Sequence, residues 1–398
     1  MGETRVLVTG ASIAGPALAH WLHRRGAEVT VLERAPGLRP GGQAVDARGV
    51  AKDVIRRMGL EEAVRAVRTE TAGSHEVDAD GVVLETQLAE DDGGDGHIAE
   101  VEVLRGDLAR VLHDDVRAHV EHLFDDRVAE IVQDAEGVDV VLAGGTRRRF
   151  DLVVGADGLH SALRAMVFGP REEFVRHLGL VLAFFTVPNE FGVDRFALDH
   201  RDGGRWAGLR PVPDASRAIA MLSFPTDAYD LDRDVEAQKR LVRERMAGFG
   251  WQTDRILAHL DDAPDLYVDQ VAQVVMDRWR RGRVGLIGDA AFCASPMSGA
   301  GTGLALVGAY LLAGELAGAG WDPEAGFAGY ERRMRGYVED NQLMGRLHVQ
   351  MITGAEPSGP DGSAAPDMDE LMRLVERAVR GPELPDYADL PDRRPSSA

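Results

Sequence analysis

The pattern of apolar positions at the start of the chain predicts a strand, a turn, a helix and a second strand. Residues 5–9 are a short apolar run of the kind shown by a buried parallel strand. Apolar residues recur at helical spacing across 16–25, and Gly26 follows as a stop signal. Residues 28–33 form another apolar run, so the chain opens on a βαβ unit.

The rest of the chain mixes helical and strand patterns. We expect helices over 50–68, 105–122, 231–262, 302–318 and 367–380, and buried strands at 148–155 and 284–288. Short strands separated by turn residues at 178–187, 195–199, 205–211 and 217–224 indicate an antiparallel sheet. The polar stretch 89–96 predicts a surface loop, and the Pro/Gly/Ser/Asp-rich stretch 353–367 predicts a linker.

These elements predict an α/β fold in which a Rossmann-like domain is interrupted by an antiparallel, α+β substrate lobe. A chain of 398 residues also exceeds what one hydrophobic core usually serves. We expect a nucleotide-binding domain over 1–70, 100–175 and 276–350, with C-terminal helices, and a substrate-binding domain over 71–99 and 176–275. Residues 351–398 should form a linker, a short helix and a polar tail.

The composition limits the classes of molecule that the protein is expected to bind. The formal net charge of −21 argues against nucleic acid and against anionic membrane surfaces. Cys293 is the only cysteine, so no internal disulfide forms, and no His/Cys cluster has metal-ligand spacing, so no metal is expected. No leader pattern precedes the first strand, and the apolar stretch 302–318 is expected to be a core helix. The sequence therefore predicts a cytoplasmic protein, a monomer or a homodimer.

The first motif is the turn Gly10-Ala11-Ser12-Ile13-Ala14-Gly15, which resembles G-x-G-x-x-G with Ser12 in place of the middle glycine. Gly10 permits the tight turn, a small residue at Ser12 lets backbone N–H groups approach a pyrophosphate, and Gly15 lets the helix pack closely on the strand. Glu33 closes the second strand, where a carboxylate can bind both ribose hydroxyls and disfavours the additional phosphate of NADP. Arg34 follows and is expected to stack over an adenine.

Two further motifs follow strands. Asp157-Gly158 comes after 148–155, and Gly288-Asp289 comes after the strand at 284. A carboxylate at the carboxyl end of such a strand lies where α/β folds bind ligands, and Asp289 could accept a ribityl hydroxyl. Pro296 follows in the chain, and the glycines at 299, 301 and 303 would let backbone N–H groups reach a flavin ring edge.

The order of these motifs resembles the single-component flavoprotein aromatic hydroxylases, the para-hydroxybenzoate hydroxylase family. The resemblance covers most of 5–345. The stretch Gly41-Gly42-Gln43-Ala44-Val45-Asp46-Ala47-Arg48-Gly49 is most similar to the actinobacterial branch that resembles tetracycline-modifying monooxygenases.

The resemblance implies FAD as the cofactor and assigns residues to it. The positions that match the family's FAD contacts are Gly10, Ser12, Ile13, Ala14, Gly15, Glu33, Arg34, Arg48, Arg105, Asp157, Asp289, Pro296, Gly301, Thr302 and Gly303. Arg48 matches an arginine that reaches over the diphosphate, and Asp157 matches an aspartate that also influences NAD(P)H use. The chain departs from the family at Phe292, where His is common, and at Gly303 and Gly308, where Asn and Asp are common. We therefore expect this loop to lack side-chain hydrogen bonds.

The resemblance also implies the reaction. FAD would be reduced by NADPH or NADH and would add O2 as a C4a-hydroperoxyflavin, which hydroxylates a small aromatic or polycyclic, polyketide-like substrate. The flavin would carry the chemistry, so no catalytic side chain is assigned. In the substrate lobe, strand alternation places Trp206 and Arg210 on one face. Arg210 could pair with a phenolate or enolate, or it could be solvated or lie in a surface ion pair.

Two other functional classes stay open at this stage. One is a different flavin-dependent oxidation on the same fold, such as Baeyer–Villiger oxygenation, epoxidation or an oxidase reaction. The other is a non-catalytic flavin-binding or drug-binding protein, for which the altered loop at Phe292, Gly303 and Gly308 is the support. A halogenase is disfavoured because Lys52 and Lys239 are the only lysines and no W-x-W-x-I-P stretch exists.

Overall fold

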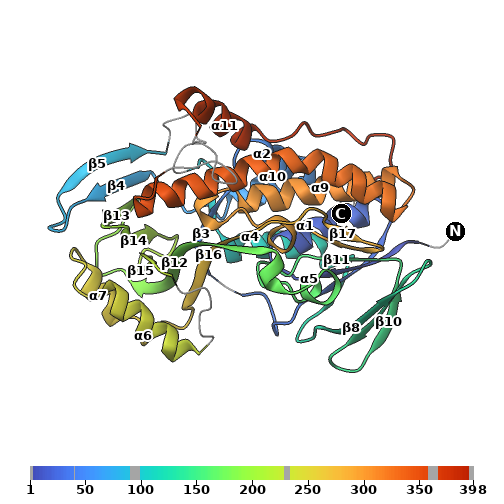
Figure 1. Ribbon diagram of the computed structural model, residues 1–398, viewed down its shortest axis with the longest axis horizontal. Coiled ribbons are helices and arrows are strands. Elements are labelled where there is room, and N and C mark those ends of the chain that lie inside the picture. The colour runs from blue at the N-terminus through green and yellow to red at the C-terminus, as the bar shows by residue number, and fades with distance from the viewer. Residues whose placement is uncertain (1–2, 40, 90–98, 228–233, 357–365, 394–398) are drawn as a thin grey trace.

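The fold is seen in a computed structural model that describes residues 3–39, 41–89, 99–227, 234–356 and 366–393 (Figure 1). Its first sheet has six strands in the order β17-β18-β11-β1-β2-β7, parallel except for the pair β17–β18. The strands are β1 (Arg5–Thr9), β2 (Glu28–Leu32), β7 (Glu121–Leu123), β11 (Leu152–Gly155), β17 (Arg280–Arg281) and β18 (Val284–Leu286). Four buried residues in each of β1, β2 and β11 place this sheet in the larger core.

Helices pack around this parallel sheet. They are α1 (Ala14–Arg24), α2 (Val50–Met58), α3 (Glu61–Arg65), α4 (Arg105–Val116), α5 (Ala162–Val167), α8 (Asp289–Phe292), α9 (Gly301–Gly318) and α10 (Pro323–Thr353). Helix α9 packs against α1, α2 and α10, and Figure 1 shows α9 and α10 running together across the molecule. By length and composition α9 could span a membrane, but 78% of its apolar window is buried inside the protein. It is the core helix that the sequence predicts.

The second sheet has seven strands in the order β16-β12-β15-β14-β13-β4-β5, with only β13 and β4 parallel. They are β4 (Gly73–Val77), β5 (Val83–Leu88), β12 (Val175–Pro188), β13 (Phe196–Asp202), β14 (Arg205–Pro211), β15 (Arg217–Pro225) and β16 (Tyr267–Val274). One face packs on α6 (Val235–Met246) and α7 (Thr253–Ala258). The other face carries Phe184 and Trp206 and packs on Met297 and Val349, which come from the helical layer around the first sheet.

Smaller elements complete the described chain. Strands β8 (Val128–Gln133), β9 (Val138–Leu142) and β10 (Arg147–Phe150) form a three-stranded antiparallel sheet, and β3 (Ala44–Asp46) pairs with β6 (Glu102–Leu104). Short 3-10 turns cover Arg171–Glu173 and Pro296–Ser298, and α11 (Met368–Arg380) follows α10.

The α/β fold class is confirmed, with a parallel nucleotide-type sheet and an antiparallel second sheet. Several element boundaries were wrong. The helix expected over 50–68 is interrupted at Gly59, which adopts a left-handed conformation (φ 81°), and the helix from 105 ends at Val116 because β7 follows. The strand expected over 148–155 is two strands, since β10 pairs with β9 whereas β11 pairs with β1.

Other expectations differ in detail or fall outside the described residues. The helical stretch 231–262 contains two separate helices, and 231–233 is not described. The expected loop 89–96 and linker 353–367 also lie mostly outside the described residues. The predicted polar tail is docked where it is described, because Arg24 makes two hydrogen bonds to Asp392 and Arg25 donates to the carbonyl of Pro391. The proposed domain boundaries stay predictions.

Candidate functional site

The Gly10–Gly15 turn joins β1 to α1 and tolerates little side-chain volume. Gly10 has φ 102°, a left-handed conformation that favours glycine, and a Cβ there would overlap the carbonyl of Ala156 at the end of β11. A Cβ on Gly15 would overlap the carbonyl oxygen of Gly10. Ile13 is the N-cap of α1 and Ala14 its first residue. The turn therefore holds its backbone N–H groups close to the helix N-terminus, an arrangement that suits an anion.

Two charged side chains flank this turn. Glu33 accepts hydrogen bonds from the backbone N–H of Ala11 (2.9 Å) and of Ala35 (2.9 Å), so it ties the turn to the end of β2. On the other side, Arg105 Nη1 donates to Ser12 Oγ at 2.8 Å. Burial lowers the pKa of Arg105, and the charge of Arg39 lowers it further. The negative charge of a diphosphate bound at the turn would raise the pKa of Arg105 again. Arg34 is exposed beside Glu33.

The Asp157-Gly158 turn is held by side chains that point into the protein. Asp157 accepts hydrogen bonds from Ser161 Oγ (2.6 Å) and from the backbone N–H of Leu163 (3.2 Å), at the start of α5. Arg164 is 1% exposed and donates to the carbonyls of Leu159 and Ala290. Arg164 therefore links the Asp157-Gly158 turn to the helix that begins at Asp289. The predicted contact of Asp157 with FAD and reductant stays a prediction.

A group of polar side chains surrounds Asp289 at the start of α8. Asp289 is exposed, and desolvation by the protein groups around its carboxyl raises its pKa. Tyr267 of β16 lies within electrostatic range of Asp289 and of Arg105, and its hydroxyl donates to Asp269 (2.9 Å). Asp269 in turn pairs with His160 Nε2 at 2.7 Å. This series of hydrogen bonds links β16 to the Asp157-Gly158 turn. The sequence analysis did not identify Tyr267, Asp269 or His160 as site residues. The alternation of Tyr267 and Asp269 along one strand was the available signal.

The segment from Ser295 to Gly303, here called the flavin loop because the family resemblance assigns it to the flavin ring, has an unusual backbone. Ser295 has φ 81°, a conformation that is rare for a residue with a side chain and often marks a functional site. A Cβ on Gly299 (φ 66°) would lie 3.0 Å from Arg48 Nη1, so Arg48 sits against this loop. Nothing lies within 4 Å of a Cβ built on Gly301. The loop between Pro296 and Gly301 therefore has the backbone freedom and open space that a planar ring needs.

The departures from the family pattern have a packing explanation. A Cβ on Gly303 would lie 2.9 Å from Tyr337 Oη, and one on Gly308 would lie 3.4 Å from Tyr330 Oη. Both tyrosines come from α10. Phe292 is buried against Trp279 and Tyr330. The tyrosine rings of α10 thus occupy the space that larger side chains at 303 and 308 would need. Thr302 is buried in the first turn of α9.

The second sheet presents a buried ion pair toward the flavin loop. Asp199 of β13 accepts hydrogen bonds from Trp206 Nε1 (2.7 Å) and pairs with Arg210 Nη1 (2.9 Å). The Arg210 guanidinium also lies 5.5 Å from the centre of the Trp206 ring. Burial raises the pKa of Asp199, but the charges of Arg210 and Arg201 outweigh it and hold the pKa below its usual value. Arg210 is 9% exposed, so the interpretation of a solvated or surface arginine was wrong.

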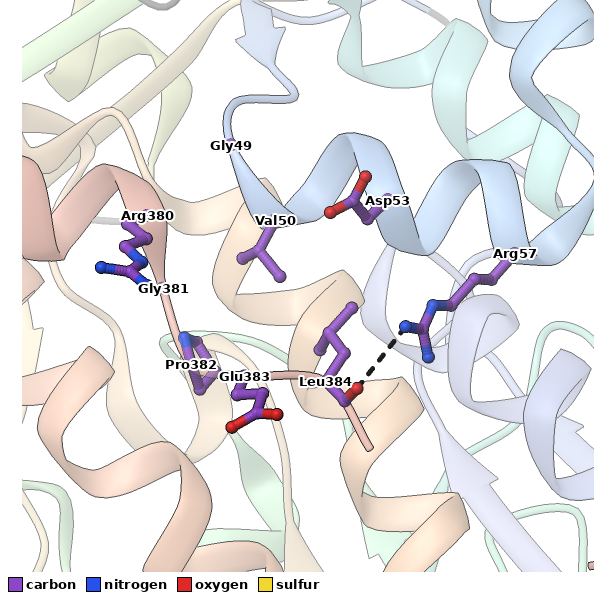
Figure 2. A pocket seen from close by; sticks show the side chains of 9 residues that line it. All are labelled: Gly49, Val50, Asp53, Arg57, Arg380, Gly381, Pro382, Glu383 and Leu384. Atoms are coloured by element: carbon purple, nitrogen blue, oxygen red, sulfur yellow. Dashed lines mark hydrogen bonds between the residues drawn. The ribbon is translucent and has the colours of Figure 1, made fainter. Parts of the chain in front are cut away.

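Two cavities lie away from these motifs. One, of about 540 Å³, lies between α2 and the segment 380–384 (Figure 2), where Arg57 donates to the carbonyl of Leu384. The other, of about 650 Å³, lies between α1 and the docked C-terminal segment. Protein groups already pair with their arginines, since Arg24 bonds Asp392 and Arg57 bonds Tyr310. The candidate site is therefore defined by the converging motifs and not by these cavities.

Comparison with known proteins agrees with this geometry. The sequence profile of the FAD binding domain family matches residues 3–341. The chain belongs to this family. It is 38% identical to a flavin-dependent monooxygenase of Legionella longbeachae over 96% of this chain and 98% of that protein. It is also 46% identical to an uncharacterized protein of Mycobacterium tuberculosis over 85% of this chain and 92% of that protein.

Solved structures give the same result. The crystal structure of the tetracycline destructase Tet(51) matches with a TM-score of 0.84 and 33% identity, covering 97% of this chain and all of that one. Klebsiella pneumoniae HpxO, solved with FAD and uric acid, matches with a TM-score of 0.73 over 94% of this chain and 91% of that chain, but at 23% identity it supports the fold alone. The chain is a flavin-dependent monooxygenase, and the non-catalytic alternative is set aside.

Proposed function

We propose that this monooxygenase uses NADPH or NADH and O2 to hydroxylate a small aromatic or polycyclic molecule. The observation that carries the proposal is the sheet face opposite the flavin loop. There the buried Phe184 and Trp206 pack with Met221 and with Met297 of the loop, and Arg210 places a buried cation at the border of this apolar cluster. We infer that this cluster lines the site of a flat molecule that bears an acidic hydroxyl.

The residues fit FAD in separable roles. The Gly10–Gly15 turn and Arg105 would bind the diphosphate, Glu33 the ribose, and Asp289 the ribityl hydroxyls. The backbone of the flavin loop would face the ring. Bound FAD would take two electrons from the reduced nicotinamide, so that one atom of O2 enters the substrate and the other leaves as water. The protein orients the substrate and excludes water.

The similarity to tetracycline destructases supports a polycyclic substrate. Tet(51) and Tet(55) are 33% and 34% identical to this chain and align with 97% of it. Tetracyclines carry ionisable enol and phenol groups on fused rings, which is the chemistry that the apolar surface and Arg210 would recognise. Baeyer–Villiger oxygenation and epoxidation are the other outcomes that product analysis would distinguish.

The proposal is tested by measuring NADPH and NADH oxidation with a panel of simple phenols, polycyclic phenols and tetracyclines. We expect a correct substrate to accelerate oxidation by roughly tenfold or more, which requires a barrier change of only about 1.4 kcal/mol. Mass spectrometry of the product should show one added oxygen. If no member of the panel accelerates oxidation or gains oxygen, the proposed substrate class is wrong.

A further inference from the structure

A carboxylate that has no role in the proposed cofactor site lies between the flavin loop and the second sheet. Asp46 is the last residue of β3, and its Oδ2 accepts a hydrogen bond from Arg48 Nη2 at 2.7 Å. Arg48 contacts Gly299 of the flavin loop, and Arg210 of the second sheet lies within electrostatic range of Asp46. Asp46 therefore lies where the three parts of the site meet.

The partner strand places a second carboxylate directly opposite. Asp46 pairs with Glu102 in the β3–β6 register. Glu102 accepts hydrogen bonds from the hydroxyls of Thr69 (2.5 Å) and Thr71 (2.6 Å). Among the described residues no such pair of hydroxyl groups donates to Asp46, and 17% of its side chain is exposed. The two neighbouring acids thus have different hydrogen-bond partners.

Within the described part of the chain, the charged groups that act most on Asp46 are Arg48, Glu102 and Arg210. Burial and Glu102 raise the pKa of Asp46, whereas Arg48, Arg210 and the backbone of Ala99 lower it, and the net result is a pKa of about 7. Below neutral pH the carboxyl holds a proton, and above it the carboxylate is ionised. Either form is accessible under physiological conditions, which is the property that a proton-transfer group needs.

We propose that Asp46 accepts the proton of an acidic hydroxyl on the bound substrate, an inference that rests on the proposed function. The substrate O–H bond breaks, a new O–H bond forms on the Asp46 carboxylate, and the electron pair stays on the substrate oxygen. Negative charge thus moves from Asp46 to the substrate, where the cation of Arg210 stabilises it. The resulting anion is more electron-rich at its ring carbons and reacts faster with an electrophilic oxygen donor. The proton leaves to solvent before the next turnover.

The protonation part is tested first in the protein without added ligand. A carboxyl whose pKa is raised on folding costs no stability below its ordinary pKa of 3.8, and the cost grows as pH rises towards about 7. Asp46→Asn removes this cost. The melting temperature of Asp46→Asn relative to wild type should therefore be higher at about pH 8 than at about pH 5. Asp254→Asn, an exposed change on α7, serves as the matched control and should show no such trend.

The catalytic part is tested with a hydroxylated substrate found in the panel above. We expect kcat/KM of Asp46→Asn to fall by roughly a hundredfold near neutral pH, as for loss of a general base. It should recover towards the wild-type value at pH above the substrate's own pKa, where the substrate ionises in solution. Asp46→Glu should restore part of the neutral-pH activity.

The outcomes separate the inference from the proposed function. Equal pH profiles for wild type and Asp46→Asn, or a relative melting temperature that does not change with pH, would overturn the role of Asp46 while hydroxylation by wild type upholds the function. A uniform loss of activity at every pH would also overturn it, since that indicates a structural role. If wild type hydroxylates nothing in the panel, the proposed function fails, and this inference fails with it.

Discussion

Gly15→Ala is expected to lose FAD affinity by roughly a hundredfold or more, equivalent to about 2.7 kcal/mol. The added Cβ would overlap the carbonyl oxygen of Gly10, which cannot move freely because the Gly10 N–H is bonded to the carbonyl of Leu32 at 2.7 Å. The N-terminus of α1 must then shift away from the turn. Its N–H groups would no longer converge on the diphosphate.

The measurement is a titration of apoprotein with FAD followed by flavin fluorescence. Gly336→Ala on α10 is the matched control, because nothing lies within 4 Å of a Cβ built on Gly336. This control should bind FAD as wild type does. Wild-type affinity in Gly15→Ala would show that the turn does not bind the diphosphate. Circular dichroism of both variants separates a local effect from loss of the fold.

Asp199→Ala is expected to destabilise the second sheet by about 3–5 kcal/mol, because it leaves a buried charge without its partner. Arg210 is 9% exposed, and Trp206 Nε1 would also lose its acceptor. The apolar surface that these two side chains border would rearrange. We therefore also expect weaker substrate binding without a matching loss of FAD.

Thermal unfolding of the holoprotein checks this expectation. Asp202→Ala, an exposed change at the end of the same strand, is the control and should melt like wild type. Asp199→Asn keeps an acceptor for Trp206 and should lie between the two. An Asp199→Ala protein that melts at the wild-type temperature would show that the buried pair does not stabilise the sheet.

Local patterns were sufficient to predict the opening βαβ unit, because its strands are continuous apolar runs and a glycine follows its helix. The same reasoning named no element within 319–352, which holds all but the last residue of the 31-residue helix α10. Glycines at 326, 329 and 345 lower helix propensity there. The structure shows why these glycines are needed. A Cβ on Gly326 would lie 2.7 Å from Leu316, and one on Gly345 would overlap the carbonyl of Ala294. Close packing against α9 and the flavin loop outweighs local propensity.

Some residues of the candidate site could likewise be found from local sequence patterns, and others could not. The turn at Gly10, the acid at Glu33 and the Gly-rich flavin loop are contiguous motifs, so spacing was enough to find them. Asp46 stood inside a quoted motif, but its importance depends on Arg210, which is 164 positions away along the chain. Asp199 likewise gains its role only from the register of β13 against β14. Contacts between distant strands are set by tertiary structure, and one sequence does not reveal them.

The most direct test of the account is the flavin content and redox cycle of the purified wild-type chain. We expect a yellow protein with one FAD per chain, whose absorbance is bleached by NADPH or NADH without oxygen and restored when O2 is admitted. This result would show that the converging motifs bind a working flavin. A protein that retains no flavin after incubation with excess FAD, or a bound flavin that neither reduced nicotinamide bleaches, would contradict the account.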